Sequence, residues 1–182
     1  EYEVDCVIFA SGFEISTEFS RRYAMDVIEG RDGVSLFDHW RDGYQTLHGI
    51  TSRGFPNQFH TGFIQGGVSA NTTAMFEQQA EHIAYIIAEA INRGATVVEP
   101  SAQAQDAWVA TIRELAFDNS AFDLSCTPGY YNNEGRGFGD ASRSFLGEVY
   151  SPGFYAFDDL LRQWRDAGDL AGLTLVCDDP GQ

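Results

Sequence analysis

The segment from Val4 to Ala10 constrains the fold most strongly, because it needs neighbours that the sequence does not supply before it. It is nearly continuously apolar, contains β-branched residues and is followed by Ser11 and Gly12. This pattern predicts a buried parallel strand followed by a tight turn. A buried strand pairs on both sides, yet only three residues precede this one. We therefore expect the chain to be a fragment of a larger α/β domain.

The strongest periodic signal lies between Asn71 and Arg93 and predicts a long amphipathic helix. Asn71 or Ser69 is a suitable N-cap, and Gly94 stands where a left-handed residue ends many helices. The apolar stripe expected to face the core comprises Phe76, Ala80, Ile83, Ile87 and Ile91, broadened by Met75, Ile86 and Ala90.

Two further helices are predicted, one capped by Ser101 and one starting near Asp158 and ending before Gly168. Their apolar stripes are Ala104, Trp108, Ile112 and Leu115, and Leu160, Leu161, Trp164 and Ala167. Short strands are predicted at 59–64 and 173–177, and residues 35–40 fit one helical turn or a short strand. The long Gly- and Asn-rich loop from Cys126 to Gly139 is typical of a functional lid.

The predicted fold class is α/β: a partial domain with about three helices and few strands. The sequence contains no internal repeat and no low-complexity linker. Residues 1–182 are therefore interpreted as a single partial domain.

Charge excludes several classes of function. The 182 residues carry 27 Asp and Glu against 11 basic residues, all of them Arg, for a formal net charge of −16. Such a chain is repelled by nucleic-acid phosphates and by anionic lipid, so we expect neither a nucleic-acid partner nor a membrane. Without Lys, the segment offers no Schiff-base or P-loop lysine.

Cysteine and histidine usage also points away from metal and disulfide chemistry. The cysteines Cys6, Cys126 and Cys177 are odd in number and far apart, which favours a reducing, cytoplasmic setting. The four histidines show no metal-binding spacing, so no metal is expected, and His82 is expected to face solvent or a neighbouring element. No apolar run is long enough to span a bilayer, and the sequence has no signal peptide.

Two segments contain residues that are suited to binding a ligand. At the start of the long helix, Gly66 and Gly67 precede a run of small polar residues, and free amides there favour an anion or a polarised carbonyl. Ordinary capping explains the same residues, and local chemistry alone favours it. Ser11 and Gly12 end the first strand in small residues that leave room for a cofactor, although a tight turn is the simpler interpretation.

Three sequence motifs together resemble those of flavin-dependent class B monooxygenases, particularly Baeyer–Villiger monooxygenases acting on large or aromatic ketones. Residues 5–13 resemble the family's D-x-[VIL]-[IV]-x-A-[TS]-G-[FY] motif, and residues 54–59 its G-[FY]-P-N-[LM]-F segment. Gly62, the glycine turn, the helix with Glu77-Gln78-Gln79 and then Trp108 follow at the family's spacing. The resemblance covers most of the chain.

The resemblance implies the carboxyl-terminal half of a Rossmann-like FAD-binding domain, with residues 1–13 as the linking strand from an absent NADP domain. It implies FAD and NADPH as cofactors and a flavin C4a-peroxide that converts a ketone into an ester or lactone. Ser11, Gly12, Asn71 and Thr72 would contact the cofactor, and Val68, Ser69 and Ala70 would line the ketone pocket. Catalytic residues and the other half of the FAD site are expected in the remainder of the same enzyme.

One departure and two alternatives remain. The family's Trp that helps to hold the nicotinamide cofactor is absent after the second helix, where Leu124-Ser125-Cys126-Thr127 stands, and Tyr130 or Tyr131 could replace it. An N- or S-oxygenating flavin monooxygenase of the same superfamily would share this fold. A non-catalytic binding module is the third interpretation. The upstream family fingerprint would separate the first two.

Overall fold

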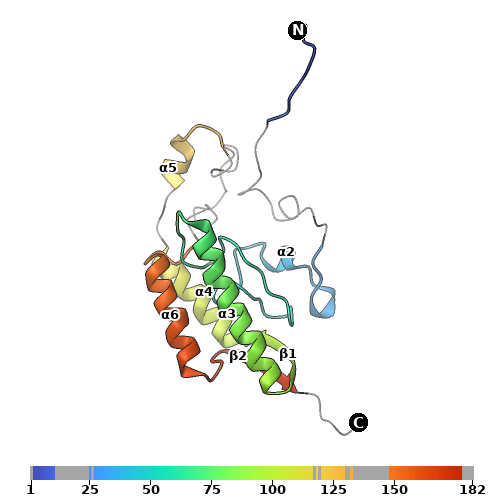
Figure 1. The fold of residues 1–182 in the computed structure, drawn as a ribbon, viewed down its shortest axis with the longest axis vertical. Helices are drawn as coiled ribbons and strands as arrows, with labels where there is room; N and C mark the ends of the chain where they lie inside the picture. Colours follow the sequence, from blue (N-terminus) through green and yellow to red (C-terminus); the bar gives the residue numbers. More distant parts are fainter. Residues whose placement is uncertain are drawn as a thin grey trace.

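The computed structural model describes residues 2–10, 25, 27–116, 118, 120–129, 132 and 148–177. Three long helices dominate it: α3 (Thr72–Asn92), α4 (Ala102–Leu115) and α6 (Phe154–Ala167) (Figure 1). The shorter elements are the 3-10 helix η1 (Arg31–Gly33) and the helices α2 (Leu36–His39) and α5 (Ser120–Ser125). Strands β1 (Ala95–Pro100) and β2 (Leu173–Cys177) form an antiparallel two-stranded sheet. Three long helices with few strands confirm the predicted fold class.

Helix α3 has the predicted bounds, but only part of the predicted apolar stripe is buried. Asn71 is the N-cap, and Gly94 adopts a positive φ of 69° directly after the C-cap. The buried residues are Met75, Gln78, Gln79, His82, Ile86 and Ala90. Of the predicted core stripe, Phe76, Ala80, Ile87 and Ile91 are exposed instead. The prediction was wrong here because apolar residues cover more of this helix than the face that packs against the rest of the chain.

The other two long helices agree with the sequence. Ser101 caps α4 as expected, since its Oγ accepts a hydrogen bond from the Ala104 amide at 3.2 Å. Helix α6 begins at Phe154, about one turn before the predicted start, and ends at Gly168, which has a φ of 70°. Strand β2 occupies the predicted range, while β1 was not predicted. Residues 35–40 form the helical turn α2, capped by Ser35.

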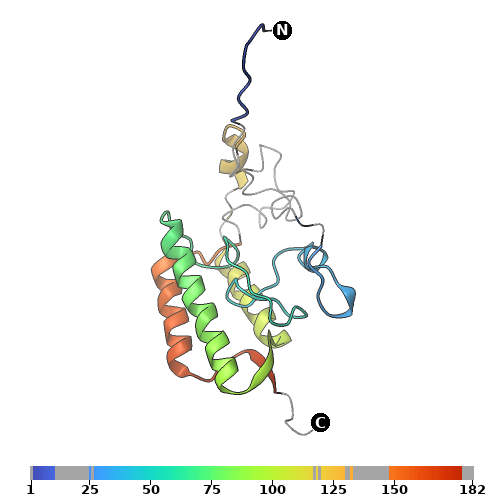
Figure 2. The same ribbon diagram turned by 45° about the vertical axis from the view of Figure 1, so that its right-hand side comes forward.

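Two predicted strands are not formed. Residues 2–10 are exposed throughout and form no strand, running away from the helices (Figures 1 and 2). Their composition favours a buried strand, but they pair with neither strand of the described sheet. Residues 59–64 are a winding segment without strand pairing, and their backbone is held by side chains from other elements, as described below.

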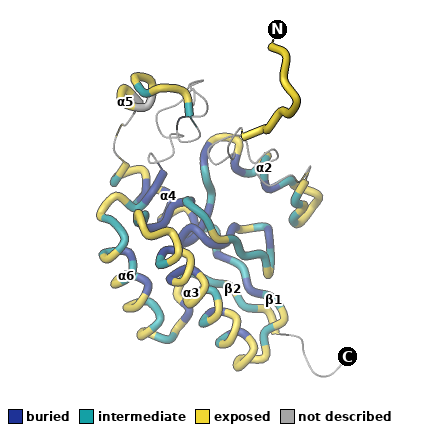
Figure 3. The backbone as a smooth tube through the Cα atoms, turned by 45° about the horizontal axis from the view of Figure 1, so that its top comes forward, coloured by how far each residue is buried: buried dark blue, intermediate teal, exposed yellow. Residues whose placement is uncertain are grey.

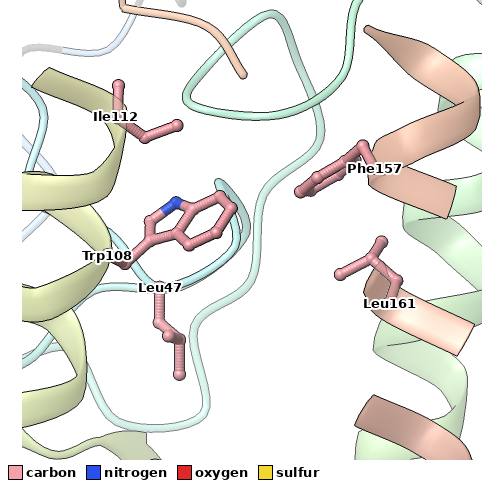
Figure 4. Packing of buried hydrophobic residues seen from close by; sticks show 5 residues of the cluster. All are labelled: Leu47, Trp108, Ile112, Phe157 and Leu161. Carbon is pink, nitrogen blue, oxygen red and sulfur yellow. The ribbon is translucent and has the colours of Figure 1, made fainter. Parts of the chain in front are cut away.

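One hydrophobic core cluster lies between α4 and α6. Trp108 and Ile112 of α4 point toward Phe157 and Leu161 of α6, with Leu47 filling the space beside them (Figure 4). Phe157, Leu161 and Ile112 are fully buried. Helix α3 lies against both α6 and β1. Burying these large side chains provides the main stabilisation of the described body.

Candidate functional site

The structure brings five of the seven predicted site residues together at the start of α3. Val68 and Ser69 are partly buried, while Ala70, Asn71 and Thr72 are exposed. Together they form an open helix start at one end of the three-helix body. Ser11 and Gly12 lie outside the described residues, as do Tyr130 and Tyr131 and most of the loop between Cys126 and Gly139.

Local hydrogen bonds shape this helix start. Ser69 Oγ accepts a hydrogen bond from the Asn71 amide at 3.1 Å, and Asn71 Oδ1 accepts one from the Ala74 amide at 3.2 Å. The first four amides of a helix have no partner within the helix, and Asn71 satisfies one of them. Asn71 therefore caps α3, as the simpler interpretation of the sequence expected. It leaves the outermost amides, at the positive end of the helix dipole, facing an exposed surface.

The side chains around the helix start suit an electron-rich ligand. No acidic residue stands in the first turn of α3, although the chain carries 27 Asp and Glu. Val68, Ser69, Ala70 and Thr72 are small, so that a flat ring can approach the amides. Partial positive charge and free space are what the electron-rich edge of a reduced flavin requires. The residues present therefore fit the implied FAD.

The preceding loop is anchored by a glutamine that was noted in the sequence but given no role. Gln79, buried on α3, donates from Nε2 to the Gly62 carbonyl at 2.8 Å and accepts from the Gly62 amide at 2.9 Å. Its carboxamide thus makes both hydrogen bonds that a neighbouring strand would make. A polar residue on the buried face of an amphipathic helix was the signal that could have revealed this function.

A second buried glutamine holds the next residues of the loop. Gln65 has a φ of 45°, and its side chain accepts from Thr46 Oγ1 at 2.6 Å and donates to the Tyr44 carbonyl at 2.9 Å. The backbone amide of Gln65 donates to the Glu148 carbonyl at 2.9 Å. These bonds tie the path of the loop to distant parts of the chain.

The two glycines of the loop serve packing rather than a ligand. A Cβ added at Gly67 would lie 2.6 Å from Phe157 Cβ and 3.0 Å from Phe154 Cα. The Gly66 carbonyl accepts a hydrogen bond from the Tyr150 amide at 3.0 Å. The loop therefore lies directly on the start of α6, and this close approach explains why position 67 requires glycine.

A buried histidine pair includes His82, which was expected to face either solvent or a neighbouring element and which contacts the latter. His82 is fully buried on α3, and its Nε2 is 3.1 Å from His48 Nδ1. Trp164 contacts both rings edge-on, and Trp108 contacts the His48 ring edge-on. Because an imidazolium is costly in such surroundings, burial lowers the pKa of His48 to about 4 and, together with the nearby His48 and Arg165 charges, that of His82 to about 3.

The pair does not form a metal centre by itself. Among the described residues, no group of three or more His, Cys, Asp or Glu side chains is placed to hold a metal ion. Nor does any helix within the described ranges have the length and apolar character needed to cross a membrane.

Comparison with known proteins shows the class to which this fold and site are similar. Nearly the whole chain matches part of the Baeyer–Villiger class of flavin monooxygenases, which confirms the predicted resemblance. No family model matches the chain. The chain spans only 26% to 30% of the length of the first curated relatives, a proportion that agrees with the expected fragment.

Individual relatives give the degree of similarity. The Baeyer–Villiger monooxygenase of Streptomyces coelicolor is 44% identical over 167 residues, which are 91% of this chain and 26% of that protein. The neopentalenolactone D synthase of Streptomyces avermitilis is 41% identical over 177 residues, covering 96% of this chain and 29% of the synthase. An FAD-binding monooxygenase of Penicillium brasilianum is 36% identical over 98% of this chain and 29% of its own length.

Solved structures agree with these sequence matches. The polycyclic ketone monooxygenase of Thermothelomyces thermophila superimposes with a TM-score of 0.75 at 34% identity, covering 88% of this chain and 25% of that protein. A cyclohexanone monooxygenase variant from Rhodococcus sp. Phi1 bound to NADP+ gives a TM-score of 0.64 at 25% identity, over 97% of this chain and 30% of the other.

Proposed function

We propose that this chain forms part of an FAD- and NADPH-dependent monooxygenase that inserts oxygen into ketones, giving esters or lactones. The observation that carries the proposal is the open, uncharged start of α3, which is suited to an electron-rich ring. The names of the relatives support it: they include Baeyer–Villiger monooxygenases, an FAD-binding monooxygenase and an NADP+-bound structure. Residues 1–182 then form one partial domain, with residues 1–13 linking it to an NADP domain.

The chain's own residues have distinct parts in this proposal. Asn71 and Thr72 lie beside the flavin, where the outermost free amide, at Thr72, stabilises negative charge on its pyrimidine edge; the flavin supplies the oxygen chemistry when it is bound. Val68, Ser69 and Ala70 line the ketone pocket on the other side. Ser11 and Gly12 complete the cofactor contacts. Gln65 and Gln79 hold the loop that fixes these positions.

The test is Thr72→Trp in a hybrid enzyme, namely the Streptomyces coelicolor monooxygenase with its matching segment replaced by this chain. The backbone amide at position 72 survives the change, so flavin content and flavin reduction by NADPH should remain near normal. The indole fills ketone space, and turnover of bulky ketones should fall about 100-fold, since small misplacements near reacting atoms are that costly. Peroxide release should rise, because oxygen activation then meets no well-placed carbonyl.

The matched control is Glu81→Trp, which adds the same bulk at an exposed position more than two turns along α3. Its kinetics should equal those of the unsubstituted hybrid. A stable, flavin-loaded Thr72→Trp hybrid with unchanged preference among ketones would show that the helix start lies away from the substrate.

A further inference from the structure

The loop that precedes α3 is part of a buried region without regular secondary structure. Residues 46–52, 64–67 and 148–149 belong to no helix and no strand, yet all of them are buried, as the dark blue segments of Figure 3 show. Loops ordinarily run over the surface, because buried backbone amides and carbonyls need hydrogen-bond partners. The partners found in this region therefore determine how the loop before α3 is held.

One of these partners is the buried carboxylate of Glu148. The residue is 6% exposed, and its Oε2 accepts a hydrogen bond from the Tyr44 amide at 2.9 Å. Gly43, with a φ of 123°, lets the backbone approach closely: a Cβ there would lie 2.8 Å from Glu148 Oε1 and 3.7 Å from Arg113 Nη2. A buried carboxylate is costly unless hydrogen bonds and positive charge compensate for it. The Tyr44 amide and the guanidinium near Gly43 contribute to that compensation.

Tyr44, Gln65 and Glu148 join three segments of the chain in a closed network. The Tyr44 amide donates to the Glu148 carboxylate, and the Tyr44 carbonyl accepts from Gln65 Nε2 at 2.9 Å. The Gln65 amide donates to the Glu148 carbonyl, also at 2.9 Å. Each residue is thus bonded to the other two. The carboxylate makes the strongest of these links, because a hydrogen bond to an ionised acceptor is stronger than one between neutral groups.

The network reaches the candidate site through two consecutive glycines. The carbonyl of Gly66, directly after Gln65, accepts from the Tyr150 amide at 3.0 Å, so the backbone at 65–66 is bonded to the backbone at 148–150 twice. Gly67 lies directly against the start of α6. Residues 68–70 follow with no intervening segment that could absorb a displacement. The place of Glu148 therefore determines where the residues of the proposed pocket wall begin.

We propose that Glu148 is a positioning residue: its buried carboxylate fixes the backbone of residues 65–70 and thereby determines which ketones the proposed pocket accepts. It touches neither the substrate nor the cofactor and acts through the Tyr44 amide and the Gln65 peptide. The effect on ketone preference rests on the proposed function. The hold on the loop does not, because it follows from contacts within this chain.

Hydrogen exchange of the full 182-residue chain, read by peptide mass spectrometry, tests the hold on the loop. Glu148→Ala removes the acceptor of the Tyr44 amide. Exchange of the amides at 43–46 and 62–67 should accelerate by about tenfold or more, because losing a hydrogen bond to a charged group makes local opening easier. Exchange in the middle of α4 should remain at the parent rate, which separates local loosening from a loss of global stability.

Two further variants serve as controls. Glu148→Gln keeps an oxygen that can accept from the Tyr44 amide, and it should restore most of the slow exchange. Glu114→Ala removes a carboxylate from an exposed position of α4 and should leave exchange of the loop unchanged. If Glu148→Ala does not fold, Glu148→Leu removes the acceptor while filling the same space.

The same variants in the hybrid enzyme test the effect on ketone preference. In Glu148→Ala, flavin content and flavin reduction by NADPH should match those of the unsubstituted hybrid, because the start of α3 keeps its own cap. The ratio of kcat/KM for a bulky ketone to kcat/KM for a small one should change by about tenfold, since small displacements near reacting atoms are costly. Glu148→Gln should keep this ratio near the unsubstituted value. A residue that only stabilised the fold would lower the melting temperature without changing the ratio.

Each outcome decides between interpretations. Unchanged exchange at 62–67 in a folded Glu148→Ala chain would overturn the positioning role, and so would a failure of both the Ala and the Leu variant to fold while Glu148→Gln folds. Faster exchange together with an unchanged ratio in an active hybrid would overturn the link to ketone preference. A hybrid that oxidises no ketone would reject the proposed function, and the exchange rates of the chain would still decide whether Glu148 holds the loop.

Discussion

Buried polar side chains, in addition to Ile86 and Ala90, connect α3 to the rest of the chain. The Gln79 side chain forms hydrogen bonds with both the amide and the carbonyl of Gly62, and His82 contacts His48 in the interior. Trp164 Nε1 donates to the Ala171 carbonyl at 2.9 Å, which holds the indole against this pair. Such groups are stable when they are paired and neutral, and they become destabilising when a charge is forced on them.

The histidines make stability depend on pH. Burial lowers the pKa of His48, His60 and His82 below the ordinary value of 6.5, so the unfolded chain binds protons more readily than the folded one. The stability that the neutral histidines contribute is fully present above the unfolded-state pKa of 6.5. It is lost as the pH falls toward the lower pKa of the folded state. When the pH is lowered from about 7.5 to about 5, the unfolding free energy should fall by about 2 kcal/mol for each buried histidine, as measured by urea denaturation.

Substitution separates the histidines from other acid effects. His82→Gln keeps a polar group near His48 but cannot titrate, so the loss of stability over the same interval should shrink. Glu81→Gln changes a charge on the same turn at an exposed site and should leave the pH dependence as it was. If the unfolding free energy depended on pH equally in the parent chain and in His82→Gln, the His48–His82 pair would not be the source of the pH dependence.

At the scale of elements, the sequence predicted what local chemistry determines. The bounds of α3, α4 and β2 follow from Asn71, Ser101 and the turn glycines. The strand predicted at 4–10 is not formed in the described structure, where these residues pair with neither β1 nor β2. The predicted buried face of α3 was right for Met75, Ile86 and Ala90 and wrong for the rest of the stripe that is exposed, because periodicity reports apolar residues without saying which side this chain covers. Strand β1 was missed, since its partner β2 lies far along the sequence.

The cap of α4 offers a test at this scale. Ser101→Ala removes the acceptor for the Ala104 amide and should lower the unfolding free energy by about 1 kcal/mol, measured by denaturant titration. Ser101→Asp restores an acceptor at the same position and should recover most of the loss. If alanine and aspartate were equally destabilising, the hydrogen bond would not be the reason that the helix starts there.

For the molecule as a whole, we propose that the start of α3 supplies only part of a cofactor site. The start of α3 and its loop are well placed, yet the sequence has no G-x-G-x-x-G turn between a strand and a helix to hold a pyrophosphate. The site residues 68–72 were found through family resemblance, because their local chemistry fits capping equally well. The anchoring contacts of Gln65 and Gln79 could not be predicted, since they join residues that only folding brings together.

The isolated 182-residue chain should therefore not retain FAD through desalting and should not oxidise NADPH. The helix start offers only a few amides to the ring and nothing to the pyrophosphate. Flavin absorbance of the desalted protein and NADPH consumption measure the two properties, with the hybrid enzyme as the positive control. If the chain alone bound flavin stoichiometrically and took up oxygen in an NADPH-dependent reaction, the proposal that it supplies only part of the cofactor site would be contradicted.

The anchored loop has a consequence for engineering substrate range. Residues 62–67 are tied to α3, to the segment at 44–46 and to the residues before α6, so random changes there would disturb the backbone itself. Val68, Ser69 and Ala70 follow this fixed stretch with side chains at least partly open to solvent. A combinatorial library confined to these three positions would vary the chemistry of the proposed pocket wall over a scaffold that stays in place, which makes them the economical starting point for redesign.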